Sequence, residues 1–263
     1  MPEILTSLHG RRVGLTDQDA LVSIGGFISG SGADQIIMPS ARNVVLFDDF
    51  LGDVVADQWN FTEGTDSSTS DGGIVEGVNG VYRLTAGDSA GSVAADYAQL
   101  NSALGWKANQ GGLRLAARIA LGSIASASCF FGFTDTKSLE GPIYASGTAN
   151  GLTSDASDAV GFMFDTAMTD DTWWLVGVKG DTDATAQNTT IAPVAATYET
   201  LAVELDTSGN ARFWRNGALL GNVMTNALTA TVALTPHFGI RPKSAAAGKT
   251  MDIDWVNVSA NRV

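Results

Sequence analysis

The chain has 263 residues, of which 30 are glycine and only 16% are charged, a composition that favours many short strands joined by turns over long helices. Its formal net charge of -13 argues against binding to the phosphate backbone of a nucleic acid, and no apolar run approaches the roughly 20 residues of a membrane-spanning helix. The start of the sequence lacks the basic-then-apolar order of a secretory signal, so we expect a soluble protein made in the cytoplasm that stays there or leaves by lysis.

The first 43 residues differ from the rest of the chain. They show no sustained periodicity, and residues 25–32 have the glycine and serine content of a flexible connector. We therefore predict an N-terminal arm over residues 1–43, followed by a folded body over residues 44–263. A solvated tail remains an alternative, but the arm holds many apolar side chains besides Arg11 and Arg12, and these favour contacts with a partner surface. The expected assembly contacts are Ile4, Leu5, Leu8, His9, Arg11, Arg12, Leu21 and Phe27.

The body contains a series of strand patterns. The clearest is residues 113–121, where leucine, alanine and isoleucine alternate with Arg114 and Arg118, the period-two pattern of a sheet with one face in a core. Asn216 and Gly217 form a two-residue hairpin signal. Further strands are expected at residues 44–47, 81–84, 129–133, 160–164, 173–178, 200–206, 236–240 and 250–258. About ten to fourteen strands in one domain predict an all-β, two-sheet antiparallel jelly roll.

One family resemblance supports this fold. Phe47-Asp-Asp-Phe50, Trp59, the 203–206 strand, the 213–217 hairpin and the closing 251–255 strand together resemble the concanavalin A-like, laminin-G-type jelly roll over residues 44–258. In that family the first and last strands lie near each other, which implies that the arm and the C-terminus share one side of the sandwich. Lectins, glycan hydrolases and structural proteins share this fold, so it does not assign a function.

A second resemblance concerns the whole chain, which is similar to a group of tailed-bacteriophage virion proteins. The stretches that carry this resemblance are residues 5–12, 47–53, 158–165 and 171–177. It implies a non-enzymatic capsid decoration or cement subunit on the virion surface, synthesised in the host cytoplasm. The expected partners are the major capsid protein, bound through the arm, and further copies of the chain in a homo-oligomer, with a trimer as the favoured state.

Two other functions stay open: a glycan-binding module of a head fibre or tail, and, third, a glycan hydrolase. Retaining hydrolases on this type of sandwich carry Glu-x-Asp-x-x-Glu on one strand, because alternation then puts all three acids on the cleft-facing side. The closest match here is Glu204-Leu-Asp206, whose third position is Gly209. We therefore predict that the protein is not an enzyme, although distant strands could still bring two carboxylates together.

Adjacent Trp173 and Trp174 should face opposite sides of a regular strand, so at most one need lie in the core. The outward ring could be covered by the arm or a loop, contact a neighbouring subunit, or stack on a sugar.

The remaining candidates favour structural roles. Cys129 lies in an apolar run and should pack as a small hydrophobic side chain, and His237 is expected to be structural or exposed rather than catalytic. No cofactor is expected. Calcium is the one option, because Asp181-Thr-Asp183 begins like a calcium loop, but Thr185 and Ala186 replace the next ligand and the glycine, so a solvated acidic turn is the favoured interpretation.

Overall fold

The structure is a computed structural model that describes residues 43–52, 55–64, 71–75, 80–87, 96–137, 141–146, 151–243 and 248–262, together with two short strands near the start of the chain. These strands, β1 (Ser7–Leu8) and β2 (Arg11–Arg12), pair antiparallel. The predicted assembly contacts Ile4, Leu5, His9, Leu21 and Phe27 lie outside the described residues. For Leu8, Arg11 and Arg12 the description is limited to this backbone pairing, so the role of the arm stays a prediction.

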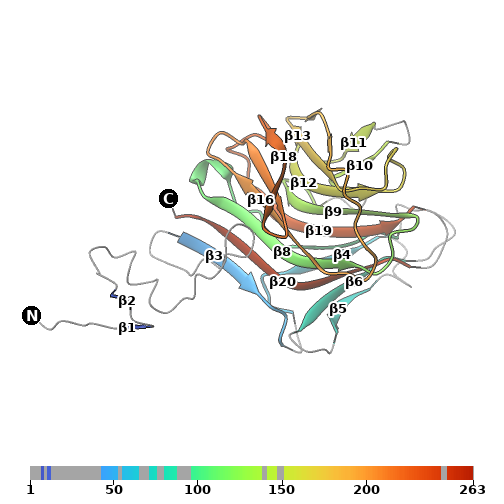
Figure 1. The fold of residues 1–263 in the computed structure, drawn as a ribbon, viewed down its shortest axis with the longest axis horizontal. Helices are drawn as coiled ribbons and strands as arrows, with labels where there is room; N and C mark the ends of the chain where they lie inside the picture. The colour runs from blue at the N-terminus through green and yellow to red at the C-terminus, as the bar shows by residue number, and fades with distance from the viewer. Residues whose placement is uncertain are drawn as a thin grey trace, which may run out of the picture.

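Two eight-stranded antiparallel sheets pack face to face (Figure 1). Sheet I contains, from one edge to the other, β14 (Thr182–Asp183), β13 (Trp174–Lys179), β12 (Asp158–Asp165), β9 (Ala127–Thr134), β19 (Thr235–Pro242), β7 (Ala98–Asn101) and β4 (Asn60–Glu63), with β15 (Gln187–Asn188) also paired to β13. Sheet II contains β18 (Ala218–Met224), β17 (Ala211–Arg215), β16 (Glu199–Leu205), β8 (Leu113–Leu121), β20 (Thr250–Asn261), β6 (Val81–Thr85) and β5 (Asp71–Val75), with β3 (Asn43–Asp48) also paired to β20.

The predicted all-β, two-sheet antiparallel fold is confirmed, and the two sheets hold more strands than the ten to fourteen expected. The predicted strand over residues 113–121 is β8, and Asn216 and Gly217 adopt positive φ angles of 49° and 79° in the turn between β17 and β18. The strands β3 and β20 pair from Asn43 opposite Asn261 to Asp48 opposite Val256, which places the first and last strands of the sandwich side by side (Figure 1).

The main core fills the space between the sheets. The strands contribute alternate side chains to it. Examples are Leu115 and Ala117 of β8, Phe131 of β9 and Phe162 of β12, which are all fully buried. Burying one such phenylalanine stabilises the fold by about 1.5–3 kcal/mol. Cys129 packs in this core, and burial raises the pKa of its thiol, in agreement with its predicted role as a small hydrophobic side chain.

A second core lies on the outer face of sheet I. The hairpin β10 (Ile143–Ala145) and β11 (Leu152–Ser154) lies above β9 and β12 in Figure 1, and Ile143 packs against Phe130, Met163 and Trp174 from the sheet below. This hairpin closes half of the outer face. The other elements of the described chain are loops and one short 3-10 helix, η3 (Ala108–Gln110), and no helix among them is long and apolar enough to cross a membrane.

Candidate functional site

Beside the hairpin, the outer face of sheet I carries a row of polar side chains, of which Asn60 is exposed while Asn101 and His237 are buried. Because Ala98 and Leu100 of β7 point into the main core, Gln99 and Asn101 point outward. Strand pairing places Asn101 between Asn60 of β4 and His237 of β19. Three polar side chains from distant parts of the chain thus lie in one row across three neighbouring strands.

A buried tyrosine fixes the histidine of this row. The Tyr97 Oη and His237 Nε2 atoms lie 2.6 Å apart in a hydrogen bond whose direction depends on the imidazole tautomer. Tyr97 reaches His237 by passing over Gly239, where an added Cβ would lie 1.7 Å from the Tyr97 Oη atom. Burial, together with the positive charge of Lys137, lowers the pKa of His237 to about 3, so the imidazole is neutral at physiological pH.

Several polar atoms of this region have no hydrogen-bond partner among the residues that the structure describes. They are Asn101 Oδ1 and Nδ2, Gln99 Oε1, His237 Nδ1 and Arg241 Nε, and all belong to buried side chains on β7 and β19. Buried polar groups are usually satisfied by protein, water or ligand. These four side chains are at most 5% exposed, so within the row only Asn60 is open to a ligand.

An open groove of about 660 Å³ lies beside the polar row, between β3, β4 and the loop that follows β7. Its lining includes the exposed side chains of Asp57, Asn60 and Lys137 and two tryptophans of the main core, Trp59 and Trp106, which are 7% and 9% exposed, and we call it the Trp59 groove. Its volume lies within the range of about 300–1,000 Å³ that small-molecule sites occupy.

Both tryptophans of the groove are held in place. Trp59 Nε1 donates to Asp48 Oδ2 over 2.8 Å, and the backbone of Trp106 pairs with that of Leu234 in both directions. The Lys137 carbonyl accepts a 3.2 Å hydrogen bond from Gln99 Nε2, so one residue belongs to both the groove and the polar row. The groove is therefore a preformed cleft with apolar walls and a few fixed polar groups.

The same face lacks the carboxylate pattern of the retaining hydrolases. The outer positions of β12 hold Ala159, Gly161, Met163 and Asp165, and the corresponding positions of β9 and β19 hold no acid. Asp165 lies at the end of β12, where its carboxylate accepts from Lys243 Nζ over 3.2 Å and from the backbone N–H groups of Ala145 and Ala167. This one acid is therefore occupied in joining the hairpin and the sheet.

The acids of the nearest sequence match lie elsewhere. Glu204 is half-exposed on the outer face of sheet II, 3.9 Å from Arg212. Asp206 ends the strand and accepts from the backbone N–H groups of Ser208 and Asn210. Burial alone would raise the pKa of Asp206, but the hydrogen bonds from Asn210 and Ser208 outweigh it and lower that pKa. Asp206 is a turn-forming residue.

Trp173 and Trp174 do face opposite sides, as alternation predicts, but neither ring is available to a sugar or a subunit. Trp173 is 1% exposed in the main core and donates to Glu199 Oε2 over 2.8 Å. Trp174 is 5% exposed in the second core, beneath Ile143 of the hairpin, and donates to the Asp170 carbonyl. Of the three alternatives for the outward ring, the structure agrees with a covered one, and the cover is the β10–β11 hairpin.

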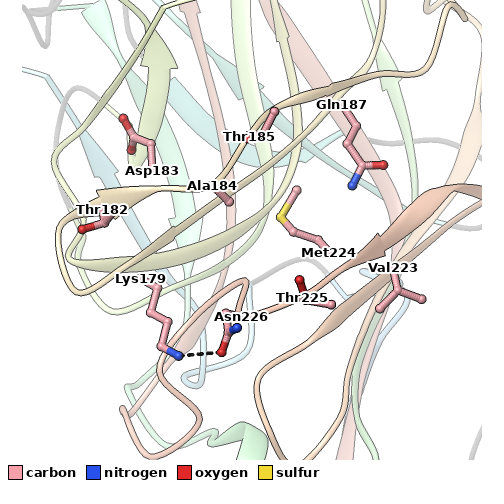
Figure 2. Close-up of a pocket in the computed structure, with 10 residues that line it drawn as sticks. All are labelled: Lys179, Thr182, Asp183, Ala184, Thr185, Gln187, Val223, Met224, Thr225 and Asn226. Atoms are coloured by element: carbon pink, nitrogen blue, oxygen red, sulfur yellow. Dashed lines mark hydrogen bonds between the residues drawn. The ribbon is translucent and has the colours of Figure 1, made fainter.

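A second groove, of about 480 Å³, lies between the edges of the two sheets (Figure 2). The Gln187 side chain spans this gap and bonds both the N–H and the carbonyl of Asn222 in β18, while Lys179 Nζ donates to Asn226 Oδ1. Met224 points into the groove and no aromatic side chain lines it.

The sequence suggested a calcium loop that begins at Asp181-Thr-Asp183. In the structure Asp183 lines the second groove, and the Asp181 carboxylate accepts a hydrogen bond from Ser157 Oγ. The described residues contain no group of three or more histidine, cysteine or acidic side chains placed to hold a metal.

The chain matches no protein-family model and no curated protein sequence. It is similar to the solved structure of a Bacillus licheniformis β-glucanase, at 13% identity and a TM-score of 0.56, covering 81% of this chain and 97% of that one. A protein of unknown function from Shewanella oneidensis MR-1 also matches at 13% identity and a TM-score of 0.56, covering 95% of this chain and 96% of that one. The carbohydrate recognition domain of Emp47p matches at 10% identity and a TM-score of 0.56, covering 86% and 99%. The fold is concanavalin A-like.

Sequence reasoning found the fold but missed the residues of this site. Asn60, Gln99 and Asn101 belong to β4 and β7, which have only four residues each and show too little periodicity to be predicted. Only His237 was considered as a candidate, and its structural interpretation agrees with its burial and its bond to Tyr97.

Proposed function

We propose that this protein is a non-enzymatic carbohydrate-binding protein whose binding site is the Trp59 groove. One observation carries the proposal: a preformed cleft of about 660 Å³ combines an apolar wall on β3 with exposed amide, carboxylate and ammonium groups, beside the outer face of a concanavalin A-like sheet. A carbohydrate recognition domain shares this fold at 10% identity.

The chemistry of the groove suits a sugar. Each sugar hydroxyl both donates and accepts hydrogen bonds, and the groove offers the acceptor-only carboxylate of Asp57, the donor-only ammonium of Lys137 and the amide of Asn60, which does both. The apolar wall formed by partly exposed Val44, Val45 and Leu46, with the small exposed parts of Trp59 and Trp106, can contact the C–H groups of a sugar ring.

We propose no enzyme activity because of the residues that the outer face of sheet I presents. Retaining glycan hydrolysis needs two carboxylates about 5–5.5 Å apart. The described strands β9, β12 and β19 together present one acid on this face, Asp165, and its oxygens are bound to Lys243 and to two backbone N–H groups. The likeness to a β-glucanase at 13% identity concerns the fold alone.

The capsid decoration role stays a prediction. The arm residues that were expected to bind the major capsid protein lie largely outside the described residues, and none of the three structures compared above is described as a virion protein. The glycan-binding alternative has the better structural support, whether the protein lies on a virion or elsewhere.

A glycan array followed by isothermal titration calorimetry tests the proposal. We expect the purified protein to bind a glycan, and Asp57→Ala and Asn60→Ala to weaken binding about tenfold each, the effect of losing one hydrogen bond of about 1.4 kcal/mol. Thr182→Ala, in the groove of Figure 2, is the matched control and should bind as wild type does.

Two results would overturn the proposal. One is binding that neither Asp57→Ala nor Asn60→Ala changes, or no binding to any glycan. The other is release of new reducing ends from a bound polysaccharide by the wild-type protein, because that result would identify an enzyme.

A further inference from the structure

In the part of the chain that the structure describes, no hairpin covers the outer face of sheet II, unlike that of sheet I. Strand pairing places Leu219 of β18 beside Trp214 of β17, and then Ala202 of β16 and Ala116 of β8 follow in the same row. The row continues through β20 to Phe47 of β3. It crosses the sheet from one edge to the other.

This row is apolar except at Asn257 of β20, which is 4% exposed, and it has large side chains at both ends. Trp214 and the neighbouring Trp255 pack over the two buried alanines and remain half-exposed. Phe47 is 42% exposed at one end and Leu219 is 52% exposed at the other. We call these six apolar residues the aromatic stripe. Single exposed apolar side chains are common, but several large ones on one face of a sheet are typical of an interaction surface.

The acids beside the stripe are paired with arginines, and Arg114, opposite Glu204 in the strand register, is a fourth arginine on this face. Arg83 binds Asp252 at 2.6 Å, Arg118 binds Asp254 at 2.5 Å, and Arg212 lies 3.9 Å from Glu204. Arg118 also lies over the ring of Tyr198, 4.4 Å from its centroid. The chain as a whole has a formal net charge of -13. This face is therefore one on which the acidity of the chain is neutralised.

We propose that the aromatic stripe is the interface of a two-fold dimer between two copies of this chain. Tryptophan and arginine are the side chains that contribute most to protein interfaces, and both are concentrated here. A strongly basic or acidic partner would bind best to a face with a large charge of the opposite sign. A second copy of the chain instead brings a face whose acids are likewise paired with arginines. Other acidic surfaces of two copies repel each other.

The size of the face agrees with a stable dimer. Six strands spaced by about 4.8 Å span about 24 Å, and the nine residues of β8 extend about 30 Å, which gives a face on the order of 700 Å². A standard interface buries about 800 Å² per partner. The stripe also suits a two-fold axis, because the Phe47 end of one copy can meet the Leu219 end of the other.

Sedimentation equilibrium over a range of protein concentrations tests this proposal. We expect the wild-type protein to be a dimer at micromolar concentration, and Trp214→Glu and Leu219→Glu each to raise the dimer dissociation constant at least a hundredfold, because both place an unpaired charge in the contact. Val194→Glu is the matched control: Val194 is 56% exposed but lies in the loop before β16, outside the stripe, and its change should leave the dimer intact.

The wild-type dimer should also persist in 1 M NaCl, since apolar contacts dominate it. Circular dichroism checks that the variants fold, and Leu219→Glu is the decisive variant should Trp214→Glu unfold, because Leu219 is largely exposed. A wild-type monomer, the trimer expected from the sequence, or a dimer that survives Leu219→Glu would each overturn the proposal. Glycan binding per chain should be the same in Leu219→Glu and wild type, so the outcome is independent of the proposed carbohydrate site.

Discussion

The outer faces of the two sheets follow the same alternation of side chains but are built in opposite ways. On sheet I the face is covered by the β10–β11 hairpin or holds buried polar groups, some with no partner among the described residues. On sheet II the arginines and acids remain partly exposed and bind each other. The first face thus buries its polar groups, whereas the second pairs its partly exposed charges with each other.

This difference predicts how each face responds to mutation. A buried polar group on sheet I has few substitute partners, so its loss leaves other groups unsatisfied. An exposed ion pair on sheet II is replaced by water at little cost. Substitutions of the same type on the two faces should therefore differ by several kcal/mol in the free energy of unfolding, and four experiments test this.

The largest effect should come from the buried carboxylate. Asp165→Ala leaves the Lys243 ammonium and two backbone N–H groups without their acceptor, and we expect it to lower the free energy of unfolding by about 3–5 kcal/mol. Asp252→Ala, which removes the partner of half-exposed Arg83, should cost about 1 kcal/mol or less. Urea unfolding followed by tryptophan fluorescence measures both, and equal losses would refute the contrast.

Glycine substitution gives the next largest difference. An added Cβ at Gly239 would lie 1.7 Å from the Tyr97 Oη atom, so Gly239→Ala must displace Tyr97 and should cost about 2–3 kcal/mol. Gly73 in β5 has no atom within 4 Å of an added Cβ, so Gly73→Ala should change stability by less than about 0.5 kcal/mol. Thermal unfolding of both variants decides this, and a neutral Gly239→Ala would contradict the packing of Tyr97.

A pH series tests the buried histidine. The pKa of His237 is about 3 in the folded chain and about 6.5 when unfolded, so the unfolded state binds the extra proton between these values. Stability contributed by neutral His237 is present above pH 6.5 and is lost as the pH falls, by about 2 kcal/mol between pH 7 and pH 5. His237→Gln cannot titrate and should show a correspondingly smaller loss in that window. Identical pH slopes for the two proteins, with His9 present in both, would disprove the assignment.

The smallest effect is expected at Glu204. Its carboxylate is half-exposed and 3.9 Å from Arg212, so Glu204→Gln should change stability by less than about 0.5 kcal/mol. Because Glu204 lies on sheet II, far in the sheet order from the Trp59 groove, glycan affinity should not change either. Calorimetry on the variant checks both expectations, and a tenfold loss of affinity would place a carbohydrate site on sheet II.

The sequence was most informative where strands are long. The alternation in β8 and the Asn-Gly turn before β18 predict these elements and the all-β fold. The candidate site was not predictable, because strand register joins residues 60, 101 and 237, and register between distant strands leaves no local pattern. The alternation of Trp173 and Trp174 was correct, but the hairpin that covers Trp174 has strands of only three residues. Whether a side chain is exposed depends on such distant segments, and the periodicity of its own strand does not show them.

The position of β20 determines when the sandwich can form during synthesis. This strand is the last of the sandwich to be translated, yet it pairs with β8 on one side and with both β6 and β3 on the other. Until residues 250–261 leave the ribosome, sheet II exists as separate pieces and the apolar β8 has an open edge. A nascent chain in that state is prone to pair with other chains, so the protein must complete its fold after almost the whole sandwich has been translated. Chaperone binding to the unfinished chain should therefore be prolonged, and a stop codon before residue 250 should yield aggregate rather than a smaller domain.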